Sequence, residues 1–242
     1  MSLSLFLVEE LPTGSEFALT GDEGRHAARV QRLGVGESLL VSDGRGTVLT
    51  CSVTAVRADG LDLAVTARRT DPAPTPRVVV VQALPKGERA ELAVELLTEL
   101  GVDEIVPWAA SRSVVRWDAA RGAKALEKWR RTAREATKQS RRAWVPVVAD
   151  LCSTAAVAER LRGATSFVLH EEATSPLVST ALGSSGEVVV VVGPEGGVSP
   201  AELEAFTAAG ATAVRLGEPV LRTSTAGAAA LAALSLRLGR WS

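Results

Sequence analysis

A glycine-rich turn at the end of an apolar strand is the clearest sign of chemistry in this sequence. Residues 187–202 read EVVVVVGPEGGVSPAE, so five consecutive valines run into a turn in which three of five residues are glycine. Glycines let a ligand approach the backbone closely, and free amide groups in such a turn can recognise a polar cofactor. Ser199, Pro200 and Glu202 follow with the pattern of a capping box, which predicts that a helix begins there. We therefore expect a ligand site at the carboxyl end of a buried strand, with a purely structural turn as the alternative.

Two further segments place polar residues after predicted strands. Residues 168–172 read VLHEE, and residues 216–226 read LGEPVLRTSTA. If these strands belong to the same parallel sheet, all three loops meet at one edge and can enclose one pocket. His170 taken alone is better explained as a structural histidine, and Glu171 and Glu172 fit a solvated loop as well as they fit a site.

Several other chemistries are excluded by the residues available. The sequence contains no Walker A loop, no G-x-G-x-x-G after a strand and no H-E-x-x-H. His26 and His170 are its two histidines, which disfavours a histidine-rich metal site and leaves few candidates for a Ser-His-Asp triad. Cys51 and Cys152 form no spaced motif, so two reduced cysteines are expected. We predict no metal.

The distribution of charge points to a nucleic-acid partner. The net charge is −1, which alone argues against such a partner, but residues 77–146 carry fourteen basic and nine acidic side chains between two acidic segments. Nine basic side chains lie between Arg121 and Arg142, against two acidic ones. Several are spaced three or four apart and would share one helix face, with Trp129 and Trp144 among them. This pattern predicts binding to a phosphate backbone, and an ordinary solvated helix face is the alternative.

The elements that must position these residues fall into two parts. From residue 3 to about 69, short strands and glycine-rich turns indicate a small β-barrel. Residues 71–76 read DPAPTP, which indicates a stiff extended linker. Beyond it, strands alternate with helices, which predicts an α/β fold with a largely parallel sheet. The expected division is 1–71, a linker at 72–76, and 77–242.

The individual elements of the second part are predicted from their apolar patterns. The strands are expected at 77–84, 105–106, 166–169, 187–192 and 213–216, and the helices at 87–100, 118–141 and from about 225 onward. The amino-terminal residues lack a basic segment, and no apolar run reaches the roughly 18 residues that would cross a bilayer. We therefore expect a soluble, cytoplasmic protein.

Several motifs together resemble one family. They are GPEGG at 193–197, LGEPVLRTSTA at 216–226, KGER at 86–89 with ELGV at 99–102, EATKQSRR at 135–142, HAARVQRL at 26–33 and DGRG at 43–46. Taken together they resemble the RsmE family, SPOUT-class methyltransferases that methylate N3 of a specific uridine in 16S ribosomal RNA. The resemblance covers essentially the whole chain.

The resemblance implies a fold, a cofactor and partners. The first part would be a PUA-like β-barrel that binds RNA, and the second an α/β SPOUT domain with a deep trefoil knot. Three loops would hold S-adenosyl-L-methionine and release S-adenosyl-L-homocysteine. The family also implies a homodimer with its active site at the interface, a substrate within the assembled 30S subunit, and no membrane partner.

Family positions carried onto this sequence give a set of cofactor-binding residues. They are Leu169, His170, Glu171, Val192, Gly193, Pro194, Glu195, Gly196, Gly197, Leu216, Gly217, Val220, Leu221, Arg222, Thr223, Ser224 and Ala226. The commoner family motif has Glu where Ser224 stands, so the role of that Glu has no counterpart here.

Methylation of a uracil nitrogen requires removal of the N3 proton and stabilisation of charge on the ring. Arg222 is the candidate for that stabilisation because a guanidinium can face an imide oxygen as a fork, and a knot-stabilising hydrogen bond is its alternative role. Glu171 or Glu172 is the candidate general base.

The predicted phosphate contacts are Arg112, Arg116, Arg130, Arg131, Arg134, Lys138, Arg141 and Arg142. Two other functions stay open at this point. One is a SPOUT methyltransferase that acts on a ribose 2′-OH, and the other is a non-catalytic RNA-binding assembly factor.

Overall fold

The computed structural model describes residues 3–183 and 186–241, which form two compact units. Unit 1 comprises Met1–Ala73 with Thr137–Val145, and unit 2 comprises Pro74–Ala136 and Pro146–Ser242. The sequence predicted 1–71, 72–76 and 77–242, and did not anticipate that 137–145 packs with the amino-terminal residues. Residues 1, 2, 184, 185 and 242 of those predicted domains lie outside the described residues.

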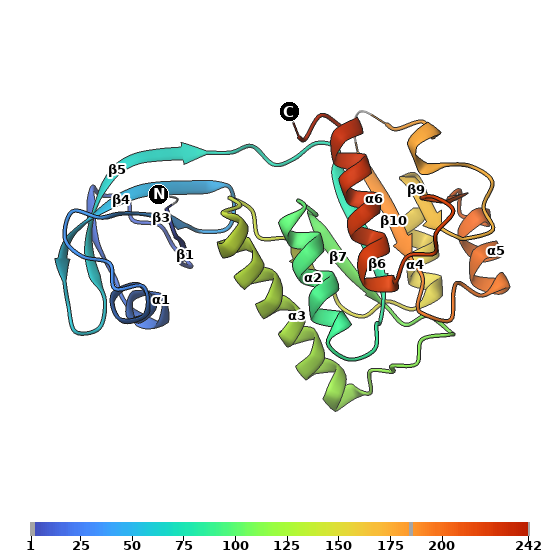
Figure 1. Ribbon diagram of the computed structural model, residues 1–242, viewed down its shortest axis with the longest axis horizontal. Coiled ribbons are helices and arrows are strands. Elements are labelled where there is room, and N and C mark those ends of the chain that lie inside the picture. Colours follow the sequence, from blue (N-terminus) through green and yellow to red (C-terminus); the bar gives the residue numbers. More distant parts are fainter. Residues whose placement is uncertain (1–2, 184–185, 242) are drawn as a thin grey trace. The chain divides into compact units, whose positions relative to one another are not determined.

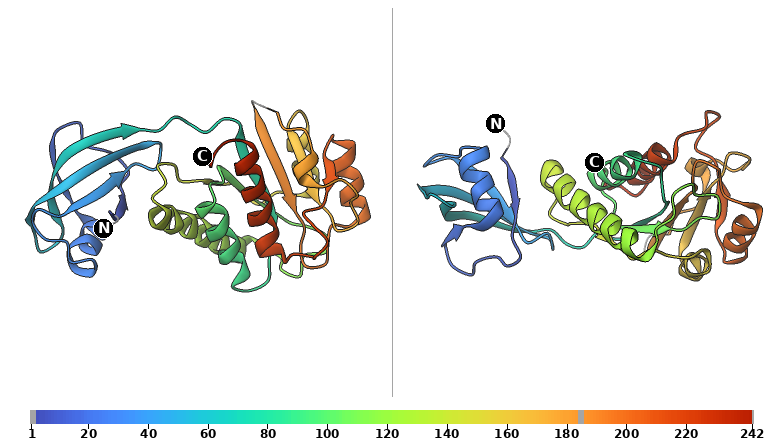
Figure 2. Two further views of the ribbon diagram at one scale, coloured as in Figure 1. Left: turned by 45° about the horizontal axis from the view of Figure 1, so that its top comes forward. Right: turned by 90° about the horizontal axis from the view of Figure 1, so that it is seen from below.

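Unit 1 is built on a five-stranded sheet of strand order β1-β3-β4-β5-β2, in which β1 and β3 are parallel and the other neighbours antiparallel (Figures 1 and 2). Side chains that alternate along β3, β4 and β5 form its core, as in Leu39, Leu49 and Leu63. Register shifts between Thr50 and Cys51 and between Val53 and Ala55 interrupt the β4–β5 ladder, and such bulges bend a sheet. The sheet is curled, which agrees with the predicted PUA-like barrel. Its elements are β1 (Leu5–Leu7), β2 (Glu16–Leu19), α1 (Gly21–Arg25), the π-helical η1 (His26–Val30), β3 (Ser38–Ser42), β4 (Thr47–Val56) and β5 (Leu61–Thr70).

Residues 137–145 pack in unit 1 through Trp144. Its indole ring fills the space beside Gly46, where an added Cβ would lie 2.6 Å from the Trp144 Cζ2 atom. The indole N–H donates to the carbonyl oxygen of Asp71 at 3.1 Å. Lys138 adds an ion pair with Glu23 at 2.9 Å, in which both side chains are largely buried. These contacts explain why residues 137–145 belong to unit 1 although their neighbours in the sequence belong to unit 2.

Unit 2 is a six-stranded parallel sheet of order β11-β9-β10-β6-β7-β8 with helices on both faces. This confirms the predicted α/β class. The strands are β6 (Arg77–Ala83), β7 (Glu104–Trp108), β8 (Val147–Val148), β9 (Thr165–Leu169), β10 (Glu187–Val192) and β11 (Thr212–Val214). The helices are α2 (Arg89–Glu99), α3 (Ala119–Ser140), α4 (Thr154–Leu161), the short 3-10 helix η2 (Leu177–Ser179), α5 (Pro200–Ala208) and α6 (Thr223–Arg237). The last turn of α3, from Thr137 onward, belongs to unit 1. Within the described ranges, no helix is both long and apolar enough to cross a membrane.

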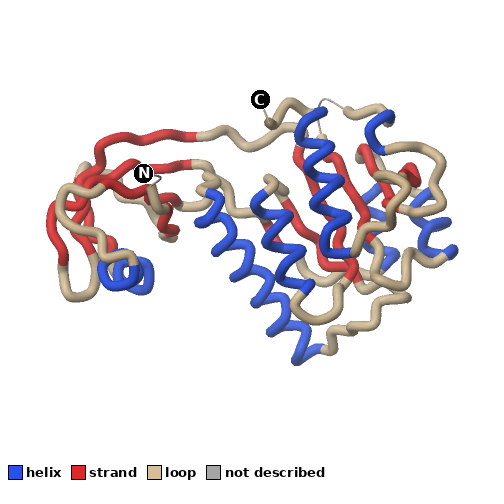
Figure 3. The backbone as a smooth tube through the Cα atoms, in the orientation of Figure 1, coloured by secondary structure: helices blue, strands red, loops and turns tan. Residues whose placement is uncertain are grey.

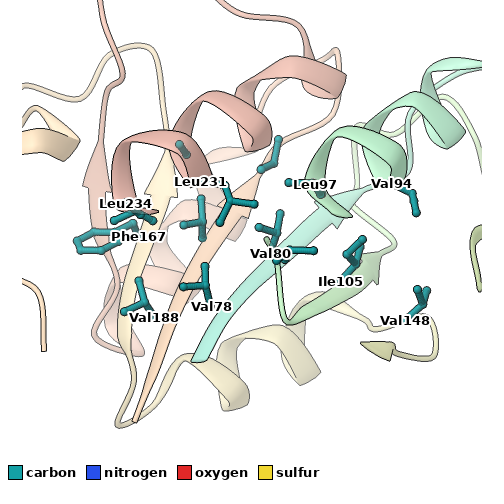
Figure 4. Packing of buried hydrophobic residues seen from close by; sticks show 14 of the residues in the cluster. Val78, Val80, Val94, Leu97, Ile105, Val148, Phe167, Val188, Leu231 and Leu234 are labelled. Atoms are coloured by element: carbon teal, nitrogen blue, oxygen red, sulfur yellow. The ribbon is translucent and has the colours of Figure 1, made fainter. Parts of the chain in front are cut away.

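The valines of β6 alternate between two cores because successive strand residues point to opposite faces. Val78 and Val80 face α2 and α6, where Leu97 and Leu231 meet them (Figure 4). Val79 joins the other core with residues of α4 and α5. Burial on both faces explains the continuous apolar runs of β6 and β10, since a central parallel strand has no solvent face.

Charged residues tie together the amino-terminal ends of three strands. Glu104, at the start of β7, is almost fully buried and accepts from Arg77 and Arg160, each at 2.8 Å. The same two arginines contact Glu187, at the start of β10, at 3.1 and 3.3 Å. Because the strands are parallel, this cluster lies at the edge opposite their carboxyl ends, which leaves the carboxyl edge for the loops of the site.

Candidate active site

Three loops that leave the carboxyl ends of β9, β10 and β11 line one cavity of about 810 Å³ within unit 2. Figure 3 draws the loops of this unit in tan. The lining includes 169–172, 192–198 and 214–223. The sheet order places β9 between β10 and β11, so the three loops predicted from the sequence meet at neighbouring strand ends. All predicted cofactor residues line this cavity except Ser224.

Each of the three glycines in the turn after β10 is required there for a different structural reason. An added Cβ at Gly193 would lie 2.9 Å from Val198 Cγ2 and 3.2 Å from the Val198 backbone nitrogen. One at Gly196 would lie 3.1 Å from the carbonyl oxygen of Arg112, and Gly197 has φ +71°. The Gly197 N–H closes the turn on the carbonyl of Pro194 at 2.9 Å. Side chains at these positions would therefore open the turn or strain it.

Glu202 anchors the exit of this turn. The predicted capping box is present: Ser199 caps α5 and the Glu202 Oε2 atom accepts from the Ser199 N–H at 3.0 Å. The Oε1 atom accepts from the Ser111 N–H at 2.6 Å and from the Thr154 hydroxyl at 3.4 Å. Burial raises the pKa of Glu202, but the hydrogen bonds from Ser111 and Ser199 together lower it by more. The pKa of Glu202 is therefore below its ordinary value. One carboxylate thus joins α5, the start of α4 and the loop that carries Arg112.

Glu202→Gln is expected to lower the free energy of unfolding by about 1–3 kcal/mol at neutral pH, because a buried charged acceptor is lost. The folded pKa is depressed, so this stabilisation is present above the ordinary pKa of 4.5 and is lost as pH falls through the folded value. Urea unfolding at neutral and acidic pH measures the difference, which is expected to shrink toward zero in acid. Glu204→Gln on the exposed side of α5 is the matched control. A difference that stays constant with pH would contradict this role for the charge.

The loop from β11 to α6 places Arg222 beside the turn after β10. Arg222 is the N-cap residue of α6 and its side chain is exposed at the cavity. The next residue, Thr223, donates its hydroxyl proton to the Gly193 carbonyl at 2.7 Å. Ser224 is 3% exposed and lies in the first turn of α6 outside the cavity lining. Ser224 is thus the one predicted cofactor residue outside this lining, and its contact with the cofactor stays a prediction.

The loop after β9 brings two carboxylates to the cavity. Glu171 and Glu172 are exposed and line it, as a general base must. His170 is half-buried, and its Nδ1 atom accepts from the Glu172 N–H at 3.3 Å. This bond gives the histidine a role in shaping the loop, and because His170 also lines the cavity its predicted contact with the cofactor stays a prediction.

Four arginines line the cavity, and two of them were not predicted as site residues. Arg112 was expected to contact RNA phosphate; it lies on the cavity wall and donates to the Gly196 carbonyl at 3.3 Å. Arg89 and Arg215 were missed. Arg89 could have been predicted from the sequence, because it lies at the start of the helix that follows the strand β6. That position is at the same sheet edge as the turn after β10. In this region the Lys86 N–H donates to Glu195 Oε1 at 3.1 Å.

The basic residues of α3 and the following segment differ in their environments. In unit 2, Arg131 is exposed, whereas Arg130 pairs with Asp150 at 2.9 Å. In unit 1, Arg141 is exposed, but Lys138 is buried in its ion pair with Glu23. Lys138 is therefore engaged within unit 1, and its contact with phosphate stays a prediction.

The remaining predicted phosphate contacts also include both exposed residues and residues engaged within the protein. Arg116 is exposed, while Arg134 and Arg142 are half-buried and engaged in other interactions.

Of the two tryptophans predicted on the basic face, Trp129 is buried instead. Trp129 is 1% exposed and packs edge-on against Trp117, with ring centroids 5.3 Å apart. Trp144 is half-buried in unit 1. A helix period identifies residues that share a face, but it does not distinguish a solvent face from one covered by another segment.

Comparisons with known proteins agree with this geometry. A family model described as "RNA methyltransferase domain" matches residues 71–235, and one described as "RNA methyltransferase PUA domain" matches residues 19–66. The chain is 49% identical over 247 residues to ribosomal RNA small subunit methyltransferase E of Mycobacterium bovis, which covers 100% of this chain and 94% of the relative. The enzyme of the same name from Bacillus subtilis is 32% identical over 237 residues, covering 94% of this chain and 91% of the relative.

A solved structure is also similar over the full length. It is a ribosomal RNA small subunit methyltransferase E from Neisseria gonorrhoeae bound to S-adenosyl methionine. The alignment has a TM-score of 0.88 and 28% identity, and covers 98% of each chain.

Proposed function

Because the chain belongs to the ribosomal RNA small subunit methyltransferase E family, we propose that it methylates N3 of a specific uridine in 16S ribosomal RNA with S-adenosylmethionine. The observation that carries this proposal is the cavity itself, in which three loops from neighbouring parallel strands meet. The similar Neisseria gonorrhoeae structure, aligned over 98% of its chain, is bound to S-adenosyl methionine.

The residues of the cavity fit this cofactor. Apolar side chains such as Leu169, Val192 and Leu203 can pack against the adenine ring, and the glycine turn lets the ligand approach backbone polar groups. Glu171 and Glu172 provide negative charge near a sulfonium cation. When bound, the cofactor supplies an electrophilic methyl group.

The protein side chains would act on the uracil ring. The N3 proton would pass to Glu171 or Glu172, the exposed carboxylates of the cavity, as N3 takes the methyl group from the sulfonium sulfur and S-adenosyl-L-homocysteine is released. The charge that develops on the ring spreads to the two imide oxygens, and the Arg222 guanidinium can face one of them as a fork and donate to it. Arg222 and the carboxylates come from different loops of the same cavity, as this division of roles requires.

Titration calorimetry and methyl mapping test this function together. We expect the purified protein to bind S-adenosylmethionine, and nuclease digestion with mass spectrometry to locate the transferred methyl group on the base of a uridine. A methyl group on a ribose oxygen would support a different RNA target. Absence of cofactor binding would support a non-catalytic RNA-binding protein.

The family and the two units also support proposals about RNA binding, oligomeric state and the form of the substrate. We infer that unit 1 binds RNA, since an RNA methyltransferase PUA domain matches part of it. The family resemblance further predicts a homodimer, a trefoil knot in unit 2, and reaction on the assembled 30S subunit in the cytoplasm. Size-exclusion chromatography with light scattering tests the dimer.

Charge reversal of the exposed arginines of α3 and the following segment is expected to weaken RNA binding. Arg131→Glu and Arg141→Glu each remove a candidate phosphate contact. The logarithm of the RNA-binding constant falls linearly with the logarithm of the salt concentration, and each lost contact is expected to make this slope less steep by about 0.7 to 0.9. The affinity for the cofactor is expected to stay unchanged. Filter binding across a salt series measures this slope. Arg162→Glu, an exposed arginine of the loop after α4, gives the same change in net charge as a control. Equal slopes for all variants would exclude these phosphate contacts.

A further inference from the structure

A chain of buried hydrogen bonds runs behind the cavity and joins three segments of unit 2. Gln82 in β6 is 0% exposed and donates through Nε2 to the Thr223 hydroxyl at 3.1 Å and to the Thr223 carbonyl at 3.4 Å. Thr223, the first residue of α6, is 5% exposed and donates to the Gly193 carbonyl at 2.7 Å. Gly193 and Thr223 line the cavity, whereas Gln82 lies outside its lining.

The direction of these hydrogen bonds is determined by the groups at each end. The amide Nε2 of Gln82 can only donate, and the carbonyl of Gly193 can only accept. The single hydroxyl proton of Thr223 must therefore point to Gly193 while its oxygen accepts from Gln82. The amide orientation is itself supported, because Nε2 also donates to the Ala83 carbonyl at 3.1 Å.

Gln82 is an unfavourable residue for its position. It is the one polar residue in the buried stretch from Val78 to Ala83, and its neighbours in register are Val192 and Pro107. Its Oε1 atom is buried and accepts no hydrogen bond from the part of the chain that the structure describes. An apolar side chain here would avoid this cost, so stability of the sheet does not explain the glutamine.

The packing of α6 keeps Gln82 and Thr223 in register. Gly227 lies one helical turn after Thr223, and an added Cβ there would lie 3.3 Å from Val192 Cγ2 and 3.5 Å from Gln82 Oε1. The first turn of α6 therefore rests directly on Gln82 and on the end of β10. Arg222 immediately precedes Thr223, so whatever holds Thr223 against Gly193 also determines where the backbone of Arg222 lies.

We propose that Gln82 and Thr223 are positioning residues that hold the start of α6 against the turn after β10 and thereby set the width of the cofactor cavity. Gln82 orients the Thr223 hydroxyl, and the hydroxyl ties the loop that carries Arg222 to the carbonyl of Gly193. Neither side chain reacts with the substrate in this role. The inference rests on the proposed function, because the cavity is assigned to S-adenosylmethionine.

Thr223→Val tests this role, since it keeps the shape of the side chain and removes the hydroxyl. We expect the Kd for S-adenosylmethionine to rise about tenfold and kcat to fall. The reason is that the distance between the turn after β10 and the loop that carries Arg222 is no longer fixed. Thr223→Ser, which keeps both hydrogen bonds, is expected to bind within about twofold of the wild type. Gln82→Leu is expected to weaken binding less, and the double variant Gln82→Leu/Thr223→Val no more than Thr223→Val alone, because the two residues form one chain.

Thr98→Val is the matched control for the loss of a buried hydroxyl. Thr98 is 0% exposed in α2, outside the cavity lining, and its hydroxyl also donates to a backbone carbonyl at 2.7 Å. Thermal unfolding of every variant shows that it is folded, and calorimetry gives the cofactor affinity. Thr98→Val is expected to lose stability but to bind like the wild type.

Three results would overturn the proposal. They are wild-type affinity in Thr223→Val, equal losses in Thr223→Ser and Thr223→Val, and additive losses in the double variant. A wild-type protein that does not bind S-adenosylmethionine would instead overturn the proposed function, and this inference with it.

Discussion

Arg222→Ala is expected to lower the rate of methyl transfer in a single turnover by about a hundredfold or more, because it removes a donor aimed at developing charge. The side chain is exposed at the cavity, and its backbone is held by the N-terminal turn of α6, in which the Thr225 N–H donates to the Arg222 carbonyl at 2.9 Å. A positioned guanidinium contributes most when charge appears on the uracil oxygens and little before that point. The Kd for S-adenosylmethionine is therefore expected to stay within about threefold of the wild type.

Two further variants sharpen this test. Arg222→Lys keeps the positive charge but not the planar fork, so we expect a rate between those of the wild type and Arg222→Ala. Arg162→Ala makes the same truncation at an exposed arginine away from the cavity and is expected to react normally. A normal single-turnover rate for Arg222→Ala would assign Arg222 to structure alone, as in its alternative role as a hydrogen-bond donor within the fold.

Gly193→Ala is expected to weaken binding of S-adenosylmethionine by between about tenfold and a hundredfold, which corresponds to the cost of overpacking a tight site. The new Cβ would lie 2.9 Å from Val198 Cγ2 and 3.2 Å from the Val198 nitrogen, and the second contact is with backbone. Because backbone cannot rotate out of the way, relief of this contact must displace the turn and disturb the hydrogen bond that the Gly193 carbonyl accepts from Thr223. Calorimetry measures the change directly.

The control for this substitution is a glycine with free space. An added Cβ at Gly14 has its nearest contact at 3.9 Å, with the carbonyl oxygen of Glu16, and Gly14 does not line the cavity. Gly14→Ala is expected to bind the cofactor like the wild type. If Gly193→Ala also bound normally, the close contact between the turn and Val198 would not shape the cavity.

The sequence predicted those features that depend on local pattern. The valine runs of β6 and β10 identify strands buried on both faces, and Ser199, Pro200 and Glu202 mark the start of α5 correctly. The three loops of the cavity were found because polar and glycine-rich residues follow strands that end at the same sheet edge. Family resemblance then supplied the chemistry that spacing alone does not contain.

Features that depend on tertiary packing were missed or misread. Trp129 and Lys138 lie among basic residues in the sequence, but other segments cover them in the fold. The packing of residues 137–145 within unit 1 depends on the fit of Trp144 to Gly46, more than ninety positions earlier in the turn between β3 and β4. Gln82 looks like a chance polar residue in an apolar strand until its contact with Thr223 is seen.

The most direct test of the proposed function is methyl transfer to 30S particles that lack the modification. The wild-type protein is incubated with S-adenosylmethionine and these particles, and the 16S RNA is digested to nucleosides and to sequence-specific fragments for mass spectrometry. We predict 3-methyluridine at a single position, formed by the wild type and nearly lost with Arg222→Ala. No methyl transfer, or a methyl group on ribose or on another base, would contradict the proposed function.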